Sequence, residues 1–137
     1  MAHTANPVLA TITSDLGKSA ASTLAELDAE LDRVAASVKP DRPIGITIER
    51  CNRDGLMAIM GAPAGMLSFT RADGNPPYFV TLGDPGADGV LAYWLTGDHH
   101  GEVPNWSLVP HEVAREAVRR FVTMDWGLPS NVTWASV

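Results

Sequence analysis

The chain has 137 residues, of which 45% are hydrophobic and 19% are charged, and its formal net charge is −6. We expect a single globular domain over residues 1–137, because this balance excludes a wholly disordered chain. The single cysteine, Cys51, excludes an intrachain disulfide and fits a reducing compartment. The start of the chain has neither a basic segment nor a long apolar run. We therefore expect no signal peptide, no membrane association and a cytoplasmic location.

The first forty residues predict one strand and one helix. Residues 1–20 are weakly patterned, and we expect an irregular segment or an edge strand there, with alternation over residues 8–13. A helix is predicted over residues 23–37, where Thr23 and Glu26 form a capping box at its start. Its apolar residues recur at helical spacing: Leu24, Leu27, Leu31 and Val34.

The middle of the chain predicts strands joined by short turns. Five apolar or alternating stretches are separated by clusters of Gly, Pro, Asp and Asn: residues 44–50, 56–60, 66–70, 78–82 and 90–95. Such a succession indicates an antiparallel meander. The next stretch, residues 96–109, lacks a clear period, and we expect it to be irregular.

The last thirty residues predict a second helix and a short strand. Pro110 suits the first position of the helix, and Glu116 and Arg120 make a favourable pair on it. Its apolar face is predicted to hold Val113, Ala114, Ala117, Val118, Phe121 and Val122. After the helix stop at Gly127 and Pro129, residues 132–135 predict a strand. We expect Trp126 and Trp134 to fix this strand to the core.

These elements indicate an α+β fold, a mostly antiparallel sheet of about five to six strands with two helices. Charge is distributed unevenly along it. No Lys or Arg occurs between Arg71 and Arg115, whereas six acidic residues do: Asp73, Asp84, Asp88, Asp98, Glu102 and Glu112. Such a stretch disfavours nucleic acid and favours a basic partner, although acidic loops can also serve solubility alone.

Two groups of residues could carry chemistry. Asp98, His99, His100 and Glu102 are the densest set of possible metal ligands, but neighbouring side chains in extended backbone point to opposite sides. The remaining histidines are His3 and His111. We expect a solvated polar loop rather than a metal site, and no cofactor.

Cys51 could act as a nucleophile, because Arg50 and Arg53 could lower the pKa of its thiol. A lone cysteine is more often a small core residue, and we expect no catalytic residue in this chain. Trp106 lies between Asn105 and Ser107 in an acidic segment. It could be a binding anchor or could cover a helix.

The C-terminal part resembles a known family. The stretches that carry the likeness are residues 91–97, 109–122, 127–129 and 132–134. Within them the matching residues are Val109, Pro110, Ala114 to Val118, Phe121, Pro129 and Trp134. Together they resemble immunity protein family one of bacterial polymorphic toxin systems, of the type directed against deaminase toxins. The likeness is good over residues 78–134 and loose over residues 44–70. Residues 124–128 depart from the pattern, because the usual arginine of this turn is missing.

The resemblance implies a non-enzymatic inhibitor that forms a one-to-one complex with a cognate toxin, often a nucleic-acid deaminase and sometimes a nuclease. A toxin that grips nucleic acid should present a basic cleft, which an acidic surface could fill. We therefore predict that the toxin contacts a set of mostly acidic residues: Asp84, Asp88, Asp98, His99, Glu102 and Trp106. The sequence leaves two other classes open, a small ligand-binding, metal-binding or enzymatic domain and a secretion chaperone or adaptor.

Overall fold

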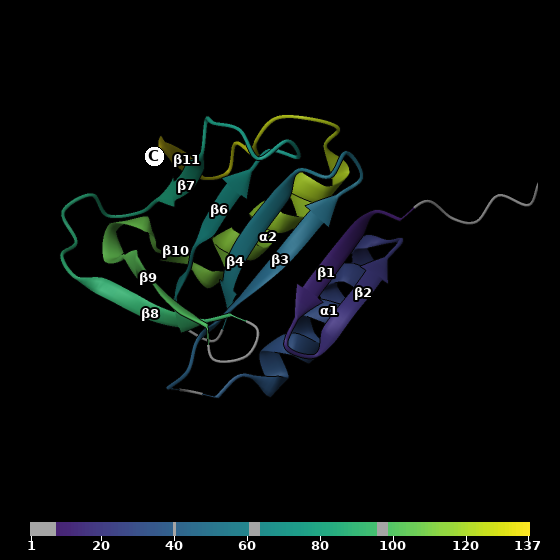
Figure 1. Cartoon of the computed structure of the whole chain (residues 1–137), viewed down its shortest axis with the longest axis horizontal. Coiled ribbons are helices and arrows are strands. Elements are labelled where there is room, and N and C mark those ends of the chain that lie inside the picture. Colours follow the sequence, from purple (N-terminus) through teal and green to yellow (C-terminus); the bar gives the residue numbers. More distant parts are fainter. Residues whose placement is uncertain (1–7, 40, 61–63, 96–98) are drawn as a thin grey trace, which may run out of the picture.

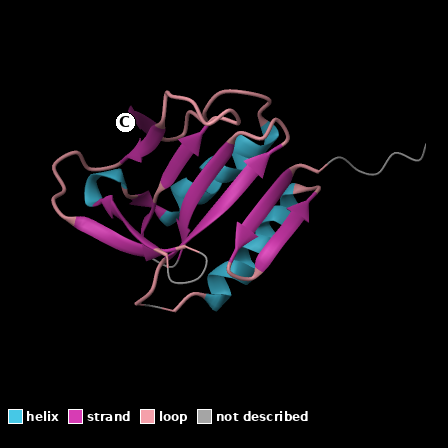
Figure 2. Cartoon of the chain, in the orientation of Figure 1, coloured by secondary structure: helices cyan, strands magenta, loops and turns pink. Residues whose placement is uncertain are grey.

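The computed structural model describes residues 8–39, 41–60, 64–95 and 99–137. Figures 1 and 2 show strands in front of two helices. The described strands are β1 (Ala10–Ser14), β2 (Gly17–Ala21), β3 (Ile44–Arg50), β4 (Gly55–Met60), β5 (Ala64–Gly65), β6 (Leu67–Thr70), β7 (Phe79–Leu82), β8 (Val90–Trp94), β9 (His100–Pro104), β10 (Val109–Pro110) and β11 (Thr133–Ser136). The described helices are α1 (Leu24–Ser37), α2 (His111–Thr123) and the short 3₁₀ helix η1 (Asn105–Ser107). The α+β class is confirmed, but the described residues form more strands than the sequence predicts.

The main sheet has the strand order β11-β7-β6-β4-β3-β1-β2. The predicted meander is confirmed from β3 through β4 and β6 to β7, where neighbours pair antiparallel. It ends there, because β8 does not pair with β7. Instead β11 pairs with β7, and β8 meets the start of β3 in a parallel bridge between Ile44 and Trp94. The weakly patterned start of the chain supplies β1 and the edge strand β2.

The predicted irregular segment over residues 96–109 is wrong in its described part. There the chain forms β9, which pairs with β8, then η1 and β10, which pairs with β5. Gly65, predicted to lie in a turn, belongs to β5, while residues 61–63 fall outside the described ranges. The two-residue strands β5 and β10 form by pairing with each other across 44 residues of chain, whereas β9 pairs with the strand that directly precedes it. None of the three shows a clear local period.

The molecule has three layers. One face of the sheet packs against both helices, and β4 contributes Leu56, Ala58 and Met60 to that core. The alternate residues Met57 and Ile59 point to the other face, where the β8–β9 ribbon covers them. The ribbon packs on this face at one end of the sheet, at the lower left of Figure 1. Its inward side chains are Leu91, Tyr93 and Val103.

Helix α1 begins as the sequence predicts. The Thr23 hydroxyl accepts a 3.1 Å hydrogen bond from the Glu26 amide, and the Glu26 carboxylate accepts a 2.8 Å bond from the amide of Ser22, one residue before the cap. Leu24 is the exception on the predicted apolar face, because it is 39% exposed. The buried residues of the helix are Leu27, Leu31 and Val34.

In α2 the predicted apolar residues are buried apart from Val113, which is half-buried. Pro110 is the N-cap rather than the first helical residue. The predicted Glu116–Arg120 pair is present at 3.1 Å.

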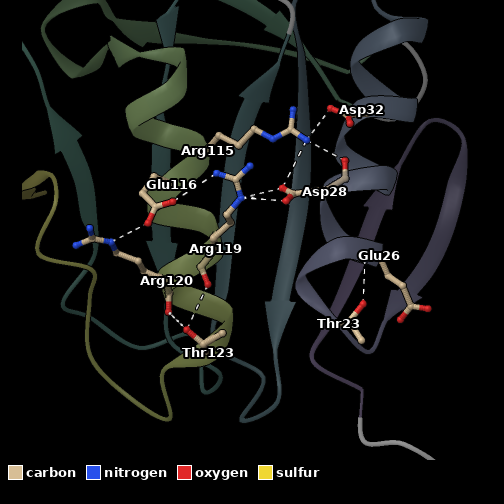
Figure 3. A network of polar contacts seen from close by, with 9 residues as sticks. All are labelled: Thr23, Glu26, Asp28, Asp32, Arg115, Glu116, Arg119, Arg120 and Thr123. Atoms are coloured by element: carbon tan, nitrogen blue, oxygen red, sulfur yellow. Dashed lines mark hydrogen bonds and ion pairs between the residues drawn. The ribbon is translucent and has the colours of Figure 1, made fainter.

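Ion pairs join the two helices along their exposed side (Figure 3). The Arg119 Nε donates to the Asp28 carboxylate at 2.9 Å. Arg115 donates to the Asp28 carbonyl oxygen at 2.8 Å and lies 2.7 Å from the Asp32 carboxylate. These arginines bridge the two helices beside the apolar core.

Candidate protein-binding surface

The β7–β8 connection carries two of the predicted contact residues, Asp84 and Asp88, and both are exposed. The Asp84 carboxylate accepts a 2.9 Å hydrogen bond from the Gly86 amide, which closes a tight turn within the connection. The Asn105 side chain donates to the Asp88 carbonyl oxygen at 2.9 Å. The connection is therefore held in place with its carboxylates in solvent.

Helix η1 lies directly against this connection. The Gly83 amide donates a 2.7 Å hydrogen bond to the Trp106 carbonyl oxygen. Only a glycine fits there, because a Cβ atom at Gly83 would lie 1.8 Å from the Leu108 carbonyl oxygen. Trp106 is thus brought beside the loop of Asp84 and Asp88, as the predicted site requires, but it is half-buried rather than exposed.

Glu102 lies on the adjoining β8–β9 ribbon. In β9 the inward residue is Val103, so the neighbouring Glu102 points outward, and it is exposed. Opposite it on β8 is Ala92, and the next outward pair is Val90 with Pro104. Val90 is 58% exposed. The outward face of the ribbon therefore combines a carboxylate with apolar surface.

The histidines lie at the far end of this ribbon. His99 and His100 are exposed, and the His100 ring packs 5.6 Å from the Trp94 ring between centroids. Asp98 lies outside the described residues, so its position in the predicted surface is not part of this geometry. Within the described ranges, no group of three His, Cys, Asp or Glu side chains could hold a metal ion.

Sequence reasoning missed a basic residue at this end of the ribbon. The Arg42 guanidinium lies 5.0 Å from the centroid of the Trp94 ring. It arrives because the start of β3 meets the end of β8, a pairing that the order of residues does not reveal. The stretch without Lys or Arg in the sequence is therefore not free of basic groups in space.

The tryptophans differ from the sequence expectation. Trp134 packs against the core, and its indole N–H donates to the Pro129 carbonyl oxygen at 2.9 Å. Trp126 was also expected to fix the last strand to the core, but it is 81% exposed. It precedes Gly127, whose φ of +86° turns the chain after α2. This turn directs Trp126 into solvent.

The lone cysteine is not a core residue. Cys51 is exposed in the β3–β4 hairpin, beside a shallow hollow that Val8, Leu9 and Arg53 also line. Its neighbour Arg50 is buried instead, at 2% exposed.

A comparison with protein-family models identifies the family of this chain. The family model described as Immunity protein Imm1 matches residues 17–136. No curated protein matches the chain. In the part of the chain that the structure describes, no helix is long and apolar enough to cross a membrane. Because the family model covers nearly the whole chain, the chain belongs to the Imm1 family of immunity proteins.

Proposed function

We propose that this chain is a cytoplasmic inhibitor that binds a nucleic-acid deaminase toxin one to one and covers its basic active-site cleft with an acidic surface. Membership of the family supports an immunity protein that acts against a toxin, and such families are generally non-enzymatic. The observation that carries the acidic mechanism is the placing of Asp84, Asp88 and Glu102. All three are exposed on adjoining segments that hydrogen bonds hold together.

Opposite charges on this surface and on a basic toxin would speed the association of the two proteins. An enzyme that acts on nucleic acid binds phosphates through Lys and Arg, so its cleft is basic. Carboxylates on a complementary surface raise the association rate and compete with the nucleic acid for the same groups. The net charge of −6 adds attraction at long range.

A co-expression experiment tests the function. The toxin domain encoded beside this chain's gene is induced in a neutral host, with and without the chain. We expect growth arrest by the toxin alone and recovery with the chain. Surviving cells exposed to a deaminase should accumulate base transitions. Growth arrest that the chain does not relieve would overturn the inhibitor proposal, whereas cleaved nucleic acid without transitions would replace the deaminase by a nuclease.

A charge-reversal pair tests the acidic mechanism. Asp88→Lys with Glu102→Lys should lower the association rate at least tenfold at low salt, and the difference should shrink as salt is added. The matched control is Asp41→Lys with Glu49→Lys, which makes the same charge change at exposed acids elsewhere. Equal losses in both variants would show that only net charge matters. A wild-type rate in the first variant would rule out the proposed surface.

A further inference from the structure

Trp126 is the most exposed large hydrophobic residue of the described chain, at 81%. It lies in the connection between α2 and β11, at the end of the sheet where the β3–β4 hairpin and the β6–β7 connection also meet (top of Figure 1). An exposed indole buries little apolar surface on folding, so it contributes little to the free energy of unfolding. Its exposure therefore indicates an interaction with another molecule rather than packing within this fold.

The backbone on both sides of Trp126 is held by the β3–β4 hairpin. The Asn52 side chain donates to the Asp125 carbonyl oxygen at 2.7 Å, and the Arg50 guanidinium donates to the Gly127 carbonyl oxygen at 2.9 Å. Arg50 itself is fixed by Asp54 at 2.8 Å. The indole is thus presented from a clamped backbone, so binding through it would cost little loop entropy.

The β3–β4 hairpin that holds this backbone also carries an exposed arginine. Arg53 adopts a φ of +73°, a left-handed conformation that favours Gly or Asn, and its side chain is exposed. This conformation is usual in a short hairpin loop, and here the Arg53 amide donates to the Arg50 carbonyl oxygen at 2.8 Å while the Arg50 amide donates to the Asp54 carbonyl oxygen at 3.0 Å. Arginine and tryptophan are also the residue types most enriched among binding hot spots.

The surroundings of the indole fit a protein partner. The two residues that follow Trp126, Gly127 and Leu128, line a shallow hollow. Its other lining residues are the apolar Phe69, Pro77 and Phe79 and the charged Asp54 and Arg71. The lining thus combines apolar surface with one negative and one positive side chain. Apolar surface with balanced charges matches the anatomy of protein interfaces and lacks the basic field that nucleic acid needs.

We propose that Trp126 anchors a second contact with the cognate toxin, in which the indole enters an apolar pocket of the toxin domain. This inference rests on the proposed basic toxin partner but not on which acidic residues contact it. A second copy of this chain is disfavoured as the occupant, because it carries the same charge of −6 and is repelled at long range. A basic toxin is attracted by that same charge.

The test measures binding of the catalytically inactive toxin domain to the full chain. Trp126→Ala should dissociate at least tenfold faster, with little change in association rate or salt dependence. Trp126→Phe should recover part of the loss. The matched control is Leu16→Ala, an apolar truncation at a residue 45% exposed in the β1–β2 hairpin, which should bind as wild type. Acrylamide quenching of the indole fluorescence should fall on binding in wild type and less so in Trp126→Phe.

Each result decides something. Wild-type dissociation of Trp126→Ala, with no protection from quenching, overturns the anchor while leaving the proposed function intact. Equal losses in Trp126→Ala and Leu16→Ala overturn it too. If the wild-type chain forms no complex with the toxin domain, both proposals fail. Self-association of the free chain that Trp126→Ala abolishes would replace the toxin by a second copy.

Discussion

Arg50 donates a 2.9 Å hydrogen bond to the carbonyl oxygen of Gly127, which lies 77 residues later in the chain. The same guanidinium lies 4.1 Å from the centroid of the Phe121 ring, and its side chain has no exposed area. One buried cation therefore joins the third strand, the end of α2 and the connection that carries Trp126. Its counter-charge is Asp54.

Replacing this arginine should destabilise the whole fold. Arg50→Met keeps the apolar stem but leaves the Asp54 carboxylate without its counter-charge and the Gly127 carbonyl oxygen without this donor, at a cost of about 3 kcal/mol in the free energy of unfolding. Arg120→Met is the control, because Arg120 forms a surface ion pair with Glu116 within α2. Such a pair contributes less than about 1 kcal/mol. Urea denaturation measures both. Equal small losses would contradict the central role of Arg50.

Asp54 should make the stability depend on pH. Burial alone would raise the pKa of its carboxyl, but hydrogen bonds from Arg50, the Ala72 amide and Asn52 together hold this pKa below its ordinary value. A lowered native pKa stabilises the fold fully above the unfolded pKa of about 4, and this contribution is lost as the pH falls through the native value. The side chain of Asp54→Asn does not ionise, so this variant lacks the pH-dependent contribution.

The measurable quantity is the difference in the free energy of unfolding between wild type and Asp54→Asn. We expect about 3 kcal/mol at pH 7, because Arg50 loses its counter-charge, and a steady decrease below about pH 4. Denaturant titrations from pH 7 down to pH 2.5 test this. A difference that stays constant over this range would show that the charge of Asp54 does not stabilise the fold.

Gly83 should not accept a side chain. The Cβ of Gly83→Ala would lie 1.8 Å from the Leu108 carbonyl oxygen, so the segment after η1 must move, at a cost of about 2–3 kcal/mol. Gly86→Ala is the matched control in the same connection, because its Cβ would have only an ordinary 3.5 Å contact with Asp84. Thermal unfolding of the two variants measures the contrast. A stable Gly83→Ala would mean that η1 is not fixed against the β7–β8 connection.

The ion pair between Asp28 and Arg119 should contribute only weakly to the stability of the contact between the two helices. A double-mutant cycle of Asp28→Asn and Arg119→Gln should give a coupling of about 0.5–1 kcal/mol, since both side chains are about one third exposed. The coupling should fall at high salt. Additive single effects at low salt would show that apolar packing alone positions α1 against α2.

Much of the fold was predictable because its signals are local. The capping residues Thr23 and Glu26, the apolar period of both helices and the glycine after α2 act within one or two turns of chain. Strands β3, β4, β6 and β7 were predictable for the same reason, since short turns make successive strands neighbours. Residues 90–95 were correctly predicted as a strand, β8, but its position was not, because β8 leaves the meander and pairs with β9. The two strands pack against the opposite face of the sheet.

The candidate site divides in the same way. The acidic character of residues 72–114 and the family likeness follow from the order of residues alone. Which side chains reach solvent does not. The buried Arg50, the exposed Trp126 and the approach of Arg42 to Trp94 depend on pairing between segments far apart in sequence. Burial is a property of what packs on a residue, and only the tertiary structure supplies those neighbours.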